Sequence, residues 1–155
     1  MLLYKQGRFF SGAVSFALPD NCYLVIAEAM NYYENGLEIT TADEEFSVAI
    51  STQYDETDTQ LYLDDMLTDT GFKRLSETKP IQAGDLFGYY AMYQDRRNKY
   101  CEYHFPIEEV NALNALVIII MTSQHGDIEA ISGSKMVKEL LDSLKKSDMN
   151  IKMAQ

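Results

Sequence analysis

Leu116-Val117-Ile118-Ile119-Ile120-Met121 is apolar at every position. A strand with one face in water alternates apolar and polar residues. This stretch does not alternate, so we predict that the segment from Asn114 to Thr122 is an interior strand lying between two helical layers. The expected architecture is therefore an α+β fold, with an antiparallel sheet of about six or more strands and helices on both faces, which is an α/β/α sandwich.

The chain on either side of this strand predicts the other elements. Alternating or apolar runs bounded by turn residues predict strands, and stretches with helical periodicity predict helices. The turn Pro19-Asp20-Asn21 predicts that the first two strands form a hairpin. Strands are expected near 13–18, 22–27, 37–41, 46–51, 73–81, 85–94 and 99–105, and helices near 57–69 and 134–146.

The last helix has the clearest pattern. Ser132 or Ser134 is its expected N-cap, and Lys145-Lys146 suits its C-terminal end. Its apolar stripe consists of Met136, Val137, Leu140, Leu141 and Leu144. Two ion pairs are expected from i,i+4 spacing, Lys135–Glu139 and Lys138–Asp142.

The register between the strands at 85–94 and 99–105 follows from side-chain matching. A slip of one residue would set Met92 against Glu102, so the register that groups apolar partners is favoured. The expected pairs on one face are Tyr93 with Tyr100, Ala91 with Glu102 and Tyr89 with His104. On the other face they are Met92 with Cys101 and Tyr90 with Tyr103.

Charge and composition limit the partners. The 155 residues carry a net charge of −11, which argues against nucleic acid as a partner. No Lys or Arg occurs from Phe9 to Phe72, so one side of the fold is expected to be acidic. This side either keeps the protein soluble or attracts a basic protein partner. The acidic residues taken as candidate contacts are Asp55, Glu56, Asp58, Asp64 and Asp65.

The sequence also suggests a compartment. Its longest apolar run, Ala115 to Met121, is too short to span a bilayer, and no secretory signal is recognised at the N-terminus, so no membrane partner is expected. The chain has two cysteines, Cys22 and Cys101, which fit a reducing compartment. A disulfide between them is the alternative. We expect a cytoplasmic protein with a single domain over residues 1–155, a core at about 9–147 and a frayed tail at 148–155.

The order of elements resembles the PsbP-like superfamily, also called Mog-like. Ser15-Phe16-Ala17-Leu18-Pro19 is similar to its opening strand, and Phe46 to Ser51 to the strand before its first helix. The meander over 72–105 and the apolar strand followed by Ser132-Gly133-Ser134 and a final helix complete the match. The resemblance implies the fold and a role in binding or assembly, since that superfamily includes a Ran-binding nuclear import factor. It supplies no site residue.

No motif predicts a metal, a cofactor or a catalytic group. Cys101 and His104 are three residues apart on a strand, so they should face opposite sides of the sheet. Glu102 and His104 share a face, and a contact between them is expected to be an incidental surface pair. The Ser132-Gly133-Ser134-Lys135 string lacks the partner motifs of penicillin-type acylases and is better explained by helix capping.

The candidate partner-binding residues on the sheet are Tyr89, Tyr93, Tyr100, Glu102 and His104. Tyrosine is favoured at binding surfaces, but the alternative is that a helix packs over this face. The function expected first is a non-catalytic protein-binding or assembly module with an acidic surface. The alternatives are a cytosolic chaperone or immunity-type protein that masks a secreted partner, and a carboxylate-dependent hydrolase. The sequence leaves monomer and dimer open.

Overall fold

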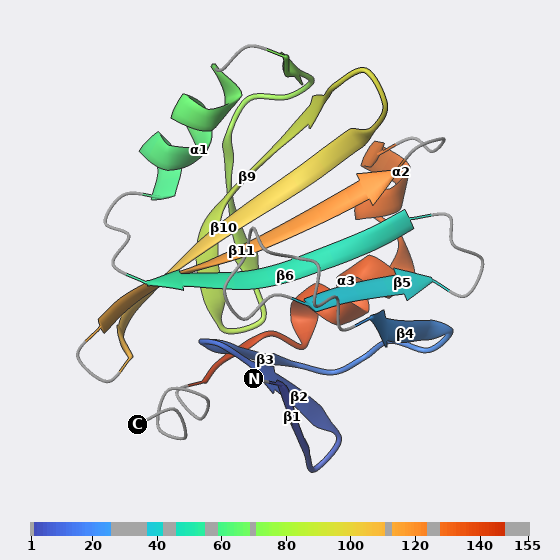
Figure 1. Cartoon of the computed structure of the whole chain (residues 1–155), viewed down its shortest axis with the longest axis vertical. Helices are drawn as coiled ribbons and strands as arrows, with labels where there is room; N and C mark the ends of the chain where they lie inside the picture. The colour runs from blue at the N-terminus through green and yellow to red at the C-terminus, as the bar shows by residue number, and fades with distance from the viewer. Residues whose placement is uncertain are drawn as a thin grey trace.

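The fold is a mostly-β α+β protein built on one large antiparallel sheet (Figure 1). The computed structural model describes residues 2–25, 37–41, 46–54, 59–68, 71–110, 113–123 and 128–147. The predicted tail at 148–155 lies outside these residues.

The large sheet has the order β4-β5-β6-β11-β10-β9-β7, and β8 also pairs with β9. Every pairing in it is antiparallel. The prediction of six or more antiparallel strands is therefore confirmed. The strands are β4 (Cys22–Val25), β5 (Leu37–Thr41), β6 (Phe46–Tyr54), β7 (Lys73–Arg74), β8 (Lys79–Ala83), β9 (Leu86–Gln94), β10 (Lys99–Val110) and β11 (Leu113–Ser123).

Strand β11 lies in the middle of this sheet, as its sequence predicts, whereas the two helical layers predicted around it are reduced to short helices. Val117, Ile119 and Met121 are fully buried on one face, and Leu116 and Ile118 are buried on the other. Because an all-apolar strand gains most free energy where neither face meets water, the central position follows from its composition.

The pairing of β9 with β10 matches the predicted register at every predicted pair. Tyr93 pairs with Tyr100, and Ala91 pairs with Glu102. The register places the side chains of β10 on two faces of the sheet. The first face is the side of the sheet that carries Cys101, Tyr103 and Phe105, and the second face carries Tyr100, Glu102 and His104.

The helices are short, and they cover the large sheet unequally. On the first face, α2 (Ile128–Ser132) and α3 (Lys135–Asp142) pack over the main core, to which α3 contributes Val137 and Leu140. On the second face, α1 (Thr59–Leu67) packs against β9 and β10 through Leu63 and Leu67. Within the described residues, helical cover of the second face is confined to this one short helix.

A separate small sheet has the order β1-β2-β3-β12 and lies below the large sheet in Figure 1. Its N-terminal hairpin turns at Gln6 and Gly7, which both have positive φ, as in the tight turns that suit hairpins. The predicted hairpin of 13–18 with 22–27 is wrong, because β3 pairs with β2 and β12 while β4 pairs with β5 in the large sheet. The strands are β1 (Leu2–Lys5), β2 (Arg8–Ser11), β3 (Val14–Phe16) and β12 (Lys145–Lys146).

The C-terminal helix is shorter than predicted. Ser134 is its N-cap and its hydroxyl accepts a hydrogen bond from the backbone N–H of Val137, as expected. The helix ends at Asp142, and Lys145-Lys146 forms β12 beside β3 instead of a last helical turn. The backbone N–H of Ser147 donates to the carbonyl oxygen of Ala13 at 2.8 Å, which further joins the segment after α3 to the start of β3.

Candidate functional site

The candidate residues on β9 and β10 do share one face, and three of them form a buried polar network. The Tyr93 hydroxyl donates to Glu102 Oε1 at 2.7 Å, and Glu102 Oε2 contacts His104 Nε2. The Glu102 and His104 side chains are 2% and 0% exposed. The prediction of an incidental surface pair is therefore wrong. Glu102 and His104 lie in the interior, where a polar group without a partner costs free energy.

Helix α1 closes this network from outside. The Tyr62 ring lies over the His104 ring with their centroids 5.2 Å apart, and Leu63 and Leu67 pack against Ala91 and Tyr93. Nδ1 of His104 has no hydrogen-bond partner within the part of the chain that the structure describes. The network can thus hold α1 in place, but its groups are closed to a partner.

Tyr100 belongs to a neighbouring turn network. Its ring stacks on Tyr93 at 4.9 Å, and its hydroxyl donates to Asp95 Oδ2 at 2.8 Å. The backbone N–H groups of Asn98 and Arg97, together with this hydroxyl, hold the pKa of Asp95 below its ordinary value. Burial, supported by the charge of Asp95, raises the pKa of Tyr100. These contacts brace the β9–β10 turn, so Tyr100 is engaged within the protein.

The opposite side of β10 offers no reactive thiol. Cys101 is fully buried on the first face, and burial raises the pKa of its thiol to about 12. Cys101 and His104 face opposite sides of the sheet, as their spacing predicts. Both cysteines are free. A thiolate–imidazole pair is therefore excluded at this place.

The acidic candidates separate in the structure. Asp64 on α1 is bound by Arg74 at 3.1 Å and by the hydroxyl of Thr78. Asp65 is exposed. Asp55, Glu56 and Asp58 lie outside the described residues, as does most of the acidic sequence before Phe72. The predicted acidic side therefore stays a prediction.

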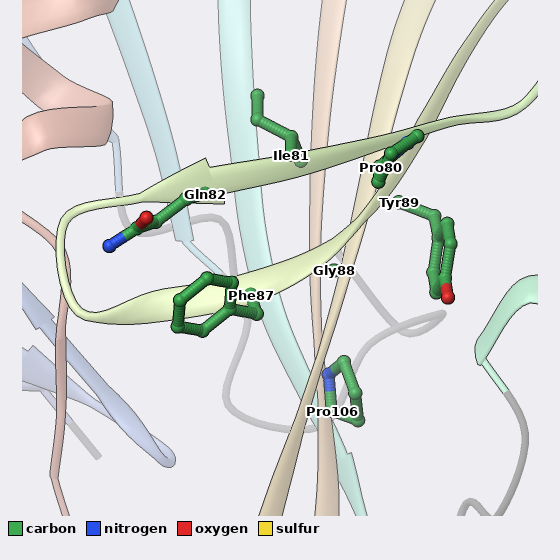
Figure 2. A pocket seen from close by; sticks show the side chains of 7 residues that line it. All are labelled: Pro80, Ile81, Gln82, Phe87, Gly88, Tyr89 and Pro106. Carbon is green, nitrogen blue, oxygen red and sulfur yellow. The ribbon is translucent and has the colours of Figure 1, made fainter.

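A concave apolar surface lies on the second face beyond α1, where β8, β9 and β10 meet (Figure 2). We call it the apolar depression; its volume is about 510 Å³. Phe87, at its rim, is 65% exposed. A Cβ at Gly88 would lie 1.9 Å from the carbonyl oxygen of His104, so glycine lets β9 approach β10 closely here. The lining residues are Pro80, Ile81, Gln82, Phe87, Gly88, Tyr89 and Pro106.

Tyr89 alone among the predicted tyrosines lines the apolar depression, and sequence reasoning missed the rest of it. The available signal was the register. Phe87 shares a face with Tyr89, and both lie opposite residues of the strand before them. What the sequence did not show is where α1 ends, and this decides which aromatic side chains remain uncovered.

The described residues offer neither a metal site nor a membrane-spanning helix. They hold no group of three or more His, Cys, Asp or Glu side chains placed to bind a metal ion. They also contain no helix of the length and apolarity needed to cross a bilayer.

Comparison with known proteins identifies the fold. No protein-family model matches the chain, and no curated protein sequence matches it. The structure of LpqN, which is involved in cell envelope biogenesis of Mycobacterium tuberculosis, is similar over 95% of this chain and 90% of LpqN, with a TM-score of 0.62 and 11% identity. A mutant form of the protein Mog1 is similar over 97% of both chains, with a TM-score of 0.50 and 9% identity.

Proposed function

The chain has the Mog1/PsbP-like fold, as its order of elements predicted, and we propose that it is a non-catalytic protein-binding module. In this proposal the apolar depression binds an apolar, basic segment of a protein partner. A fold of this kind does not specify a function, so the proposal depends on the surface itself.

The observation that carries the proposal is the exposure of Phe87 at the rim of a concave apolar surface. The Phe87 ring is 65% exposed beside Pro80, Tyr89 and Pro106. A partner that covers this ring removes apolar area from water, which is favourable for binding. Aromatic anchors in such positions carry much of the binding energy at protein interfaces.

Charge supports a basic partner. The chain carries a net charge of −11, and Asp85, two residues before Phe87, is exposed. A negative chain increases the rate of encounter with positive partners, and the effect weakens with salt. A cytoplasmic location is part of the same proposal, and both free cysteines are consistent with it.

The test is capture of partners from native cell extract by the tagged protein and by two variants. Phe87→Ser should lower the affinity for the captured partner by about tenfold or more. Tyr4→Ser is the matched control, since Tyr4 is also 65% exposed but lies on the small sheet. Capture should also weaken between ~0.05 M and ~0.5 M salt.

A partner that binds Phe87→Ser and the unchanged protein equally would contradict the proposal. If the affinity does not change with salt concentration, the partner is not basic, and only the apolar contact of the proposal remains. An equimolar complex with one dedicated secreted protein would make the function that of a chaperone or immunity-type protein.

A further inference from the structure

A second cavity lies on the first face, between the β8–β9 hairpin and helices α2 and α3. We call it the α2–α3 groove; its volume is about 410 Å³, within the range of small-molecule sites. It lies on the opposite side of the sheet from the apolar depression, since Tyr90, Met92 and Tyr103 line it. The two cavities share Ile81 and Gln82 of the edge strand β8, and their other lining residues differ.

The floor of the α2–α3 groove is aromatic and apolar. Tyr103 and Met92 are 2% and 8% exposed, and Tyr90 is half-buried. The Tyr90 and Tyr103 rings stack with their centroids 5.5 Å apart and their planes at 20°. Leu141 of α3 closes the floor from the helical side. A flat aromatic ligand can extend this stack and gain both apolar burial and ring contact.

The rim of the α2–α3 groove carries a lysine on each wall. Lys79 belongs to β8 and Lys138 to α3, and both line the groove. The Lys138–Asp142 pair expected from spacing is not formed, and neither lysine has an ion pair with any carboxylate among the described residues. Lys135, by contrast, contacts Glu139 at 3.8 Å on the same helix. Glu129 and Asp142 line the groove as well, so the lysines favour a ligand with one negative group that lies directly between them.

We propose that the α2–α3 groove binds a small aromatic anion of the aryl carboxylate class. The aromatic ring packs on Tyr90 above Tyr103 and Met92, and the carboxylate lies between Lys79 and Lys138. Asp142 and Glu129 also line the groove, so a second anionic group would be disfavoured.

The test uses three probes with the same ring and different charge: 1-naphthoate, 1-naphthalenemethanol and 1-naphthylmethylamine. Affinities are measured by isothermal titration calorimetry, and the site is mapped by changes in the NMR chemical shifts of backbone amides. The chain's net charge of −11 favours the amine at long range. We expect the affinity to be highest for naphthoate, about tenfold lower for the alcohol and lowest for the amine. This order opposes the net charge of the chain, so it would have to come from the nearby lysines.

Variants locate the charge. Lys79→Gln and Lys138→Gln should each lower naphthoate affinity by about three- to tenfold and leave the alcohol unchanged. Lys135→Gln is the matched control on the same helix and should alter neither. Tyr90→Leu should weaken all three probes together while the preference for the anion remains.

Three results would overturn the assignment. The first is equal binding of all three probes, and the second is no binding of naphthoate at millimolar concentration. The third is a set of shifts centred on Phe87 and Tyr89, which would place the probe in the apolar depression on the other side of the sheet.

Discussion

Strand β10 presents Cys101, Tyr103 and Phe105 to the first face and Tyr100, Glu102 and His104 to the second. The first face packs against helices and the small sheet through apolar side chains. The second buries a carboxylate and an imidazole under one nine-residue helix. One strand thus contributes to two kinds of interior. The apolar one is stabilised by burial and packing, and the polar one depends on each group keeping its partner.

The largest loss of stability is expected for a variant in the core of the first face. Leu140→Ala should lower the free energy of unfolding by about 4 kcal/mol, because Leu140 is fully buried in the main core and the cavity would lie between α3 and the sheet. Leu63→Ala on the second face should cost about 2 kcal/mol, because the short helix α1 can shift to fill part of the space. Urea unfolding of both variants measures the difference.

Equal losses for Leu140→Ala and Leu63→Ala would show that α1 is held as rigidly as α3. Glu139→Ala, at an exposed position of α3, is the control and should change stability by less than about 0.5 kcal/mol.

The second prediction tests the polar interior. Glu102→Ala should cost about 3 kcal/mol, because it leaves the Tyr93 hydroxyl and the His104 ring buried without their acceptor. Glu102→Gln should cost less, since an amide oxygen still accepts one hydrogen bond. Thermal and urea unfolding measure both.

The double variant Glu102→Leu with His104→Leu sharpens this comparison. Replacing both members of a buried pair by apolar residues is often nearly neutral. The Tyr93 hydroxyl still loses Glu102, but no imidazole is left beside it, so the double variant should be more stable than Glu102→Ala. If the double variant is the least stable of the three, the Glu102–His104 pair contributes more stability than apolar side chains in its place.

The contrast between the faces also shows what the sequence could predict. The β9–β10 register and the central position of β11 follow from which side chains match, a property of neighbouring stretches. The same matching predicted that Tyr93, Glu102 and His104 share a face. It could not show that they are buried, because this depends on where α1 lies in three dimensions.

The two wrong predictions, the hairpin of 13–18 with 22–27 and the helical end at Lys145-Lys146, have a common cause. The turn residues before Cys22 mark the end of β3 correctly, but they do not show that the chain passes to another sheet. Lys145-Lys146 reads as a helix end in sequence, and its partner β3 lies about 130 residues earlier. Partners that distant in sequence leave no local pattern, so strands are easier to predict than their pairing.

A smaller effect concerns how α1 is fastened. Asp64 accepts from Arg74 at 3.1 Å and from Thr78, which links α1 to the segment before β8. Both charged side chains are about one-third or more exposed, so Asp64→Ala should cost less than about 1 kcal/mol. Amides of α1 should nevertheless exchange faster with solvent, while those of α3 remain unchanged. Faster exchange in both helices would mean that the two faces open together.

The smallest effect is at the edge of the second face, where Asp95 braces the turn next to the Tyr93–Tyr100 stack. Its pKa is lowered from 3.8, chiefly by the backbone N–H groups of Asn98 and Arg97. The ionised carboxylate therefore stabilises the fold above pH 3.8, and this contribution is lost as the pH falls through the lowered pKa. Asp95→Asn should lower the urea midpoint slightly at neutral pH, and the difference from the unchanged protein should shrink on acidification. A difference that is constant down to acid pH would show that the turn depends on hydrogen-bond geometry and not on charge. The second face would then owe its stability at this edge to the same neutral contacts that hold the first.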